Sequence, residues 1–261
     1  MLKFASFVFA TLLSVTAAFA QTPEIEQIHR QMLLPSVQVD ALKGTGSGTV
    51  ISSREVNGNF RTYILTNHHV IAASISIIEY FDQESKSNKK REKFENVQVR
   101  FHRYANRNRY TGSDNRLANI VAYDAQADIA LLILDDNAPV TNVAIIAPKD
   151  ARIDRGERVY AVGAGLGVPP FMTEGRVGSI GHRIDGHPYI LASAPIIFGN
   201  SGGALFRMNS EYNYEFIGIP SRVSSTGGFF SSTAVTHIGW HIQLDTIREF
   251  LERNRLSHII D

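Results

Sequence analysis

Short apolar runs separated by turn residues are the feature of this sequence that most restricts its fold. Such runs occur at residues 60–66, 158–163, 176–180, 189–192, 216–219 and 238–242. The pair Asn57-Gly58 precedes the first run, and Asn-Gly beside an apolar run is the strongest short-range signal for a β-hairpin. Many short strands with turns between them are typical of all-β barrels or sandwiches. The sequence therefore predicts an all-β protein, built as one large unit or as two small barrels.

Two segments depart from this strand pattern. Residues 24–34 carry apolar side chains at helical spacing, which predicts a short amphipathic helix lying on the body of the protein. Residues 243–253 give a stronger signal, because Leu244, Ile247 and Phe250 fall on one helical face. We therefore expect a C-terminal α-helix.

The first 20 residues are typical of a secretory signal. Lys3 provides a positive start, residues 4–15 are apolar, and Ala18-Phe19-Ala20 is a small-x-small cleavage site. We expect the mature chain to begin at Gln21, outside the cytoplasm, and an uncleaved anchor is the alternative. Once the signal with Lys3 is removed, the number of basic residues equals the number of acidic residues, 25. The mature chain then has no net charge, which argues against a global attraction to nucleic acid or membranes.

The sequence contains no cysteine. Disulfide bonds and catalysis by a thiolate are therefore excluded, and an exported fold must be held together by its hydrophobic core. About 240 residues are long enough to bury such a core.

A turn of small residues, Gly199-Asn200-Ser201-Gly202-Gly203, lies between two apolar runs. A serine that acts as a nucleophile needs such a tight turn, with free backbone N–H groups directed at the same point. Glycines permit the unusual backbone and leave room for a substrate carbonyl. An ordinary turn between two strands is the alternative interpretation.

A histidine pair and an aspartate are the other candidates for chemistry. His68 and His69 directly follow the strand 60–66, and neighbouring residues of an extended strand point to opposite faces. We therefore expect only one of the two histidines to face a given site, and no third ligand at a suitable spacing supports a metal site. Asp128 enters the apolar run 129–134, so its carboxylate needs a partner, such as a histidine N–H. A helix cap or turn residue is the structural alternative.

Two further stretches have ambiguous patterns. Glycines alternate through residues 44–48, but no helix follows them, so strand ends and a bend are favoured over a phosphate-binding loop. Basic residues outnumber acidic ones in residues 80–116, with aromatic residues between them. This segment is interpreted as one long solvated hairpin, with Val97, Val99 and Phe101 alternating on its return strand, and a nucleic-acid interface is the alternative.

Three stretches together resemble the catalytic motifs of trypsin-like serine proteases, most closely those of the bacterial Do-like (high-temperature-requirement) branch. They are Thr66-Asn67-His68-His69-Val70, Asp128-Ile129-Ala130-Leu131-Leu132 and Gly199-Asn200-Ser201-Gly202-Gly203. Their order is that of the chymotrypsin class and not of subtilisins or α/β-hydrolases. The resemblance implies two six-stranded antiparallel β-barrels with a C-terminal α-helix. The expected divisions are the signal (1–20), the N-terminal segment with the first barrel (21–140) and the second barrel with the helix (141–261).

The resemblance also implies roles for individual residues. Ser201 would be the nucleophile, His69 the general base, and Asp128 the acid that orients the imidazole. The backbone N–H groups of Gly199 and Ser201 would form the oxyanion hole, and Ser221 would support the acid. The implied substrate-binding residues are Pro195, Phe198, Ser221, Arg222, Val223 and Gly239, with residues 221–223 pairing with the peptide backbone.

The residue before the cleaved bond (P1) is expected to be small or apolar. The sixth position before Ser201, where an acid would favour Lys or Arg, is held by Pro195. His237 and His241 lie near the same wall in sequence, so a preference for acidic residues is the alternative.

The sequence thus predicts a secreted or periplasmic serine endopeptidase that acts on peptides or unfolded proteins through an acyl-enzyme, with no metal or cofactor. Asn200 and the expected start at Gln21 both depart from the pattern of trypsin-type zymogens, which are activated when a new amino terminus is cut. This departure predicts that the protein is active without such a cleavage. A catalytically silent binding module is the alternative function.

The resemblance leaves other features as expectations or unexplained. No peptide-binding module is expected after the final helix, no stable membrane insertion is expected after signal cleavage, and the family suggests oligomerisation through residues 24–34. The resemblance does not account for residues 80–116 or for residues 224–233, which we interpret as a loop bordering the cleft.

Overall fold

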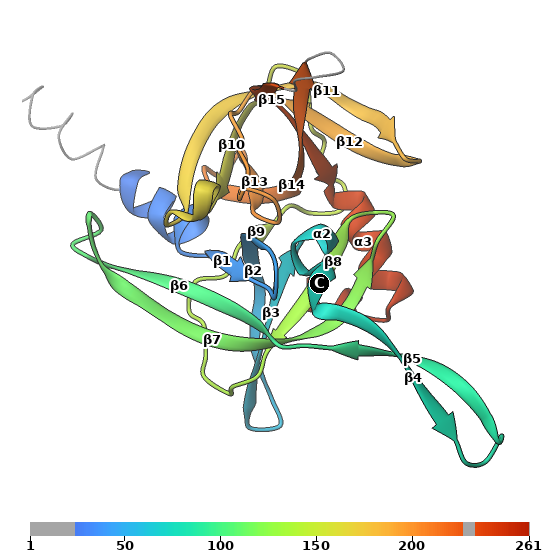
Figure 1. The fold of residues 1–261 in the computed structure, drawn as a ribbon. Coiled ribbons are helices and arrows are strands. Elements are labelled where there is room, and N and C mark those ends of the chain that lie inside the picture. Colours follow the sequence, from blue (N-terminus) through green and yellow to red (C-terminus); the bar gives the residue numbers. More distant parts are fainter. Residues whose placement is uncertain (1–23, 227–232, 261) are drawn as a thin grey trace, which may run out of the picture.

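The computed structural model describes residues 24–226 and 233–260. The predicted signal and the predicted start at Gln21 lie outside the described residues, as does most of the predicted loop 224–233. The described chain forms two β-structures that lie one above the other, with a helix packed at the side (Figure 1). The predicted all-β architecture with two barrels and a C-terminal helix is confirmed.

The first barrel closes from six antiparallel strands in the order β1-β2-β3-β8-β7-β6. Their bounds are β1 (Ser36–Asp40), β2 (Thr45–Val56), β3 (Asn59–Thr66), β6 (Val97–Ala105), β7 (Arg109–Asp124) and β8 (Ile129–Leu134). The predicted turn joins β2 to β3, with positive φ at both Asn57 (53°) and Gly58 (80°). Alternate strand residues such as Val37, Val39 and Ile64 fill the barrel and are fully buried.

The second barrel is a ring of six antiparallel strands in the order β13-β10-β11-β12-β15-β14, closed by the pairing of β13 with β14. Their bounds are β10 (Arg158–Gly163), β11 (Phe171–Ile184), β12 (His187–Ala192), β13 (Ala204–Met208), β14 (Tyr214–Thr226) and β15 (Thr233–Gln243). A two-residue strand, β9 (Ile145–Ile146), pairs in parallel with β14 and was not predicted. It lies on the connection between the two barrels.

Short helical segments surround the barrels. These segments are residues 24–28, η1 (His29–Leu33), α2 (His68–Ile71), η2 (Ala72–Ser74), η3 (Gly165–Gly167), α3 (Leu244–Arg253) and η4 (Ser257–Ile259). Helix α3 buries Ile247, Phe250 and Leu251 in the core, as its pattern predicted. In the described part of the chain, no helix has the length and apolar character that a bilayer span requires.

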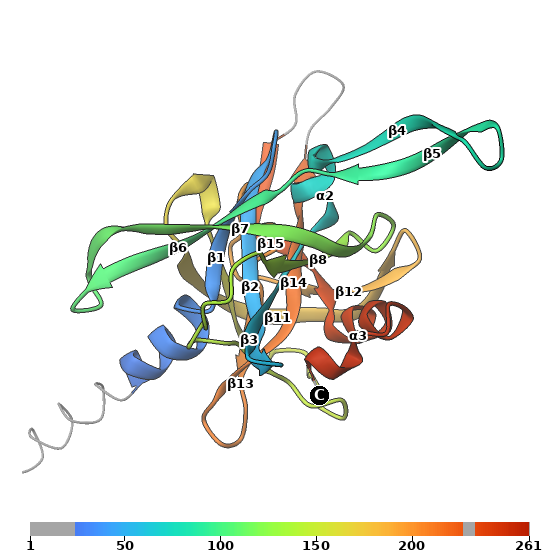
Figure 2. The same ribbon diagram turned by 90° about the horizontal axis from the view of Figure 1, so that it is seen from below.

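Residues 80–116 differ from the prediction of one long hairpin. The chain makes two hairpins here: β4 (Ile75–Asp82) pairs with β5 (Ser87–Phe94) as a separate sheet, and β6 pairs with β7 inside the first barrel. The β4–β5 hairpin projects from the body in two perpendicular views (Figures 1 and 2). The chain returns to the barrel between the hairpins because Val97 and Val99 fill its core and are fully buried.

Candidate active site

The carboxylate of Asp128 collects four hydrogen bonds at the boundary between the barrels. His69 Nδ1 lies 2.9 Å from Asp128 Oδ2 and 3.0 Å from Oδ1, and the backbone N–H of His69 donates to Oδ1 at 3.0 Å. The Ser221 hydroxyl donates to Oδ2 at 2.7 Å from the second barrel. Burial of Asp128 raises its pKa, but the hydrogen bonds and charge interaction with His69 and the bond from Ser221 outweigh burial, so its pKa lies below the ordinary value.

Asp128 owes its position to the turn that precedes β8. It is 8% exposed and has a left-handed backbone (φ 58°), which aspartate tolerates better than most residues. The Asn67 side-chain amide donates to the Asp128 carbonyl at 2.7 Å, so the turn is tied to the residue that starts helix α2. The apolar run predicted after Asp128 is the buried strand β8.

The two histidines face different neighbours, but the extended geometry assumed for them is wrong. Strand β3 ends at Thr66, and residues 68–71 form helix α2, in which consecutive side chains lie about 100° apart. His69 therefore faces Asp128, whereas the His68 ring stacks on Tyr123 with centroids 5.1 Å apart. Burial lowers the pKa of His68, and the nearby Asp128 charge only partly opposes this.

Ser201 lies in the turn between β12 and β13, against the start of α2. Gly202 has a left-handed backbone (φ 85°), and a Cβ added there would lie 2.2 Å from the Ser47 carbonyl oxygen and 3.0 Å from the Asn67 nitrogen. The structure thus brings the turn to the segment that bears His69. No hydrogen bond joins the Ser201 hydroxyl to His69 among the described residues, and such contacts are often long in free enzymes.

Ser47 in the first barrel holds this turn in the second. Its N–H donates to the Ser201 carbonyl at 2.7 Å, and its hydroxyl donates to the Gly199 carbonyl at 2.6 Å. The same hydroxyl accepts a bond from the Ala164 N–H at 2.7 Å. Sequence reasoning missed this role for residues 44–48. Glycines on both sides of Ser47 were the available signal, since glycine within a strand marks a close approach of another backbone.

The backbone N–H groups of Gly199 and Ser201 have no hydrogen-bond acceptor within the described part of the chain. The Phe198 carbonyl accepts a bond from the Leu166 N–H at 2.7 Å. In a trans peptide the carbonyl and the following N–H point in opposite directions, so this bond also orients the Gly199 N–H. The turn therefore has two backbone N–H donors that no described group uses.

The residues implied in substrate binding lie on the segment that precedes Ser201 and on strands β14 and β15. Phe198 is 70% exposed, Pro195 is exposed, and Arg222 forms an ion pair with Asp185 at 2.6 Å. Val223 pairs with the buried Gly239 of β15. Strand β14 continues past the end of β13, so its residues 221–226 pair only with β15 among the described strands. The other edge of this stretch is therefore available for an extended peptide.

His241 lies behind these residues and not at the surface. It is fully buried, and neither ring nitrogen has a hydrogen-bond partner in the described structure. Burial lowers the pKa of His241 to about 3. A Cβ added to Gly239 would lie 3.1 Å from His241 Nε2 and 2.8 Å from the Ile196 side chain, so the ring is packed next to Gly239. His237, by contrast, is exposed.

Asn200, which the resemblance places where trypsin-type zymogens have an aspartate that receives the newly cut amino terminus, is 1% exposed. Its side-chain oxygen accepts a bond from the Ile197 N–H at 3.0 Å, and its N–H donates to the Ile197 carbonyl at 3.0 Å. These bonds between uncharged groups close the turn that carries Gly199 and Ser201.

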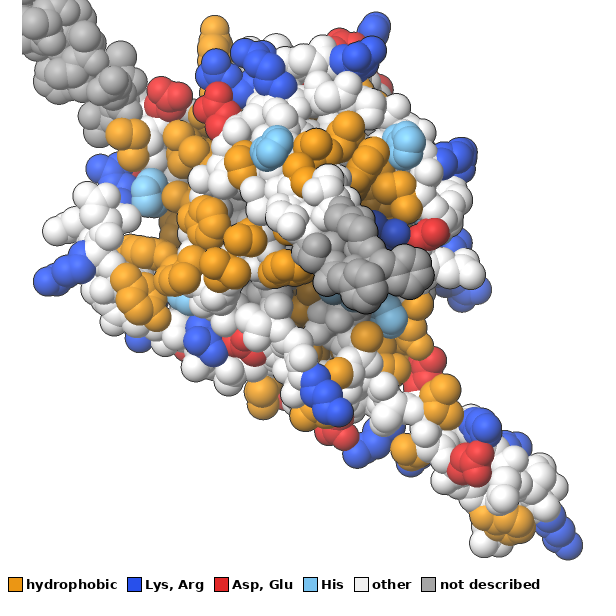
Figure 3. All heavy atoms as spheres, turned by 45° about the horizontal axis from the view of Figure 1, so that its top comes forward, with side chains coloured by type: hydrophobic (Ala, Val, Ile, Leu, Met, Phe, Trp, Pro, Cys, Tyr) orange, Lys and Arg blue, Asp and Glu red, His pale blue; other side chains and the backbone are white. Residues whose placement is uncertain are grey.

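The basic residues of 80–116 do not form one continuous patch, because most of them have acidic partners. The pairs are Lys89–Asp82, Lys90–Glu79, Lys93–Glu95, Arg100–Asp40, Arg107–Glu26 and Arg116–Asp136. In the space-filling view, acidic and apolar side chains interrupt the basic ones on the projecting hairpin at lower right (Figure 3). This pairing weakens the nucleic-acid interpretation, since phosphate binding relies on unpaired cations.

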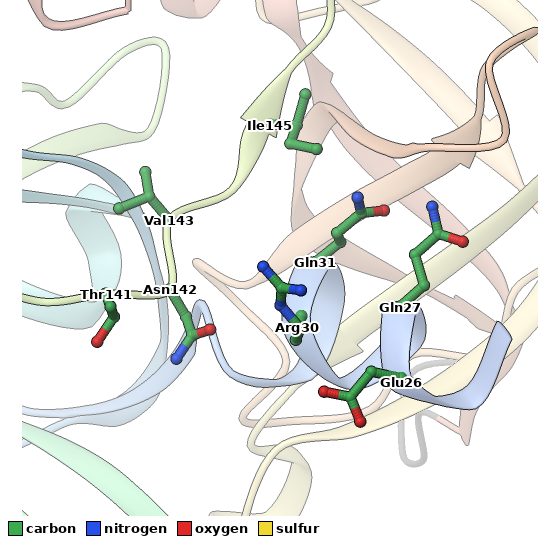
Figure 4. A pocket seen from close by; sticks show the side chains of 8 residues that line it. All are labelled: Glu26, Gln27, Arg30, Gln31, Thr141, Asn142, Val143 and Ile145. Carbon is green, nitrogen blue, oxygen red and sulfur yellow. The ribbon is translucent and has the colours of Figure 1, made fainter. Parts of the chain in front are cut away.

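A cavity of about 510 Å³ lies apart from the residues described above (Figure 4). Side chains of the N-terminal helical segment and of the connection between the barrels line it: Glu26, Gln27, Arg30, Gln31, Thr141, Asn142, Val143 and Ile145. None of the predicted catalytic or substrate-binding residues belongs to this lining.

Comparison with known proteins defines the class. The two-barrel fold is shared with the serine endoprotease from Yersinia pestis (TM-score 0.59, 22% identity, covering 88% of this chain and 65% of that one). It is also shared with an inactive form of Rv3671c protease (TM-score 0.56, 19% identity, covering 85% and 89%). A family model described as the trypsin-like peptidase domain matches residues 46–219. The chain belongs to this family, as the sequence motifs predicted.

Curated relatives include the periplasmic pH-dependent serine endoprotease DegQ of Escherichia coli (strain K12). It is 30% identical over 75% of this chain and 35% of its own length. A probable periplasmic serine endoprotease, DegP-like, of Pseudomonas fluorescens is 30% identical over 71% of this chain and 30% of its own length. The chain therefore spans about a third of the length of the curated relatives that it matches.

Proposed function

We propose that this protein is an exported serine endopeptidase that cleaves peptide bonds through Ser201, His69 and Asp128. The observation that carries the proposal is the His69–Asp128–Ser221 hydrogen-bond set, located where the Ser201 turn meets the start of α2. Membership of the trypsin-like peptidase family supports the same assignment.

In the proposed reaction, Asp128 accepts the Nδ1–H of His69, which leaves Nε2 free to accept a proton. The Ser201 hydroxyl attacks the substrate carbonyl as its proton passes to His69. The resulting oxyanion is bound by the N–H groups of Gly199 and Ser201. His69 then protonates the departing amine, and water releases the acyl group from Ser201 by the same steps. The lowered pKa of Asp128 keeps it ionised, so that it stabilises the transient imidazolium.

The proposed substrate is an extended peptide or unfolded protein that pairs with the free edge of residues 221–226. The proposed preference at P1 is a small or apolar side chain. Ile196 packs against Gly239 in this region, and His241 is neutral because of burial, so His241 supplies no cation there for an acidic side chain. The reaction as proposed needs no metal or cofactor.

Other parts of the proposal rest on relatives and on the turn. The relatives named as periplasmic support a secreted or periplasmic location. The neutral hydrogen bonds of Asn200 support activity without zymogen cleavage. We also infer that residues 24–34 are the place to look for contacts in an oligomer, and that the barrels divide near residues 140 and 141.

Labelling with a serine-directed fluorophosphonate tests the nucleophile and base. We expect labelling of the wild type and its loss in Ser201→Ala and His69→Ala, with cleavage of an unfolded polypeptide lost in parallel. Ser210→Ala, at an exposed serine, is the matched control and should behave as the wild type. Equal labelling of all four proteins would overturn the proposal. Peptide binding without labelling or cleavage in the wild type would instead support a silent binding module.

A further inference from the structure

The β4–β5 hairpin is an addition to the body of the protein that the proposed function does not use. It forms a sheet of only two strands, and neither outer edge pairs with another described strand. Every residue of β5 is exposed. A two-stranded hairpin is at best marginally stable in water, and free strand edges readily accept further strands. These properties indicate a surface that binds a partner.

The strand register places four large apolar side chains on one face of the hairpin, together with Glu79, Lys90, Glu92 and Asn88. Ile75 lies opposite Phe94, Ile77 opposite Glu92, and Phe81 opposite Asn88, and paired residues of antiparallel strands share a face. We call the apolar residues Ile75, Ile77, Phe81 and Phe94 the apolar face of the hairpin. Ile77 is 69% exposed, Phe81 57% and Phe94 43%, so this face is open to solvent.

The apolar face leads to the candidate active site. At its base, Phe94 lies edge-on to the ring of Tyr123, with centroids 6.3 Å apart. The Tyr123 hydroxyl bonds to Glu92 on the same face, and its ring stacks on His68 at 5.1 Å. His68 is adjacent in sequence to His69. An occupant that extends along the face to its inner end therefore reaches His68, which lies within range of the charges of Asp128 and His69.

The charges of the hairpin do not favour a polyanion. Lys90 pairs with Glu79 at 3.2 Å, Lys89 pairs with Asp82 at 2.5 Å, and Lys93 pairs with Glu95 at 2.6 Å. The Lys90–Glu79 pair lies on the apolar face, whereas the Lys89–Asp82 pair lies on the opposite face. The Arg91 guanidinium also lies on the opposite face, 5.3 Å from the centroid of the Tyr80 ring. Since the cations are largely engaged, apolar contact and backbone pairing are the interactions that the hairpin has to offer.

We propose that the β4–β5 hairpin is a substrate-binding arm that holds an extended, apolar segment of a polypeptide outside the site of cleavage. The inference rests on the proposed function, because the substrate is the partner that must lie at both places. The apolar face ends at Tyr123 and His68, and His68 precedes His69 of the proposed triad, so a substrate segment bound there can remain connected to the bond being cut.

The binding test uses the Ser201→Ala protein, so that substrate is bound without being cut. The probe is a fluorescently labelled, permanently unfolded polypeptide, followed by anisotropy. In this protein we expect the double substitution Ile77→Ser, Phe81→Ser to raise Kd about ten-fold or more, because burial of each large apolar side chain contributes strongly to the free energy of binding. Tyr80→Ser, on the opposite face of the same strand, is the matched control and should change Kd less than two-fold. Equal Kd values for all proteins would overturn the inference.

A kinetic test in the protein with Ser201 intact separates the arm from the chemistry. The Ile77→Ser, Phe81→Ser variant should lower kcat/KM about ten-fold for the unfolded polypeptide and leave cleavage of a short peptide unchanged. A variant that joins Ser76 to Lys93 through a short Gly-Ser turn should do the same, which guards against a local folding defect of the point variant. An equal loss for both substrates would overturn the arm as a remote binding surface.

Other occupants give different results and would also overturn the inference. If the hairpin joins two copies of the chain, the double variant will shift the mass in sedimentation without changing polypeptide binding. If it binds nucleic acid, single-stranded DNA will bind with steep salt dependence, lost on changing Lys89 and Lys90 to Ser. Failure of the proposed function is distinguishable, because arm-dependent binding by Ser201→Ala would then persist while fluorophosphonate labelling of the wild type is absent.

Discussion

The two barrels differ in how they hold their parts of the candidate site. The first barrel places His69 and Asp128 through its own elements, since α2 closely follows β3 and Asp128 directly precedes β8. The second barrel places Ser201 in a turn whose carbonyl groups are held by Ser47 of the first barrel. Acid and base are thus positioned locally, whereas the candidate nucleophile depends on the contact between barrels. The dependence is mutual at one point, because Ser221 of the second barrel donates to Asp128.

The largest expected effect tests the locally built half of the site. Asp128→Asn should lower kcat about 10⁴-fold at pH 7, because the amide donates where the carboxylate accepts and so favours the wrong tautomer of His69. The shape of the side chain is retained, so the melting temperature should change little. Measurement of kcat and of thermal unfolding checks both parts. A loss below ten-fold would show that the first barrel does not supply the orienting acid.

The second prediction concerns the pH dependence of stability that His241 causes in the second barrel. His241 is neutral in the folded protein with a pKa of about 3, whereas its unfolded value is near 6.5. The unfolded state therefore binds a proton that the folded state does not, and the free energy of unfolding falls as the pH drops below about 6.5. Between pH 7 and pH 5 this loss is about 2 kcal/mol.

Comparison with His241→Leu isolates this contribution, because leucine has no proton to bind. Denaturant unfolding at pH 7, 6 and 5 should show a steeper loss of stability in the wild type than in the variant. Parallel pH curves for the two proteins would contradict the prediction and would mean that an unseen partner satisfies the imidazole.

The third prediction tests the dependence of the serine turn on the first barrel. Ser47→Ala removes the bond to the Gly199 carbonyl and leaves the Ala164 N–H without its acceptor. We expect kcat to fall about 10- to 100-fold, with KM little changed, and stability to fall by about 1–3 kcal/mol. Ser52→Ala, in the same strand, is the control and should keep wild-type kcat. If Ser47→Ala loses stability and keeps full kcat, the contact holds the barrels together without positioning the turn.

The smallest expected effect is that of the reciprocal contact. Ser221→Ala removes one of several hydrogen bonds to Asp128, and His69 continues to donate to the carboxylate. We expect kcat to fall about three- to ten-fold, in line with about 1 kcal/mol for one bond. A loss as large as that in Asp128→Asn would show that the acid depends on the second barrel as strongly as the serine turn depends on the first.

Much of the fold and of the candidate site could be predicted from local patterns. The Asn57-Gly58 turn, strand β8 after Asp128, and helix α3 depend on neighbouring residues and were predicted correctly. The three motifs also led to the correct family. What failed was the local geometry around His68 and His69, because the chain after strand 60–66 does not stay extended but forms a short helix tied to Asp128 by Asn67.

The sequence by itself determined the class of fold, because strand length, turn residues and apolar alternation act between residues close in the chain. Only the tertiary structure decided that Ser47 holds the Ser201 turn, that residues 80–116 divide into two hairpins, and that His241 is buried without a partner. These features arise from contacts between segments far apart in the chain. No local pattern carries that information, since the same serine, turn or histidine is equally compatible with an exposed position.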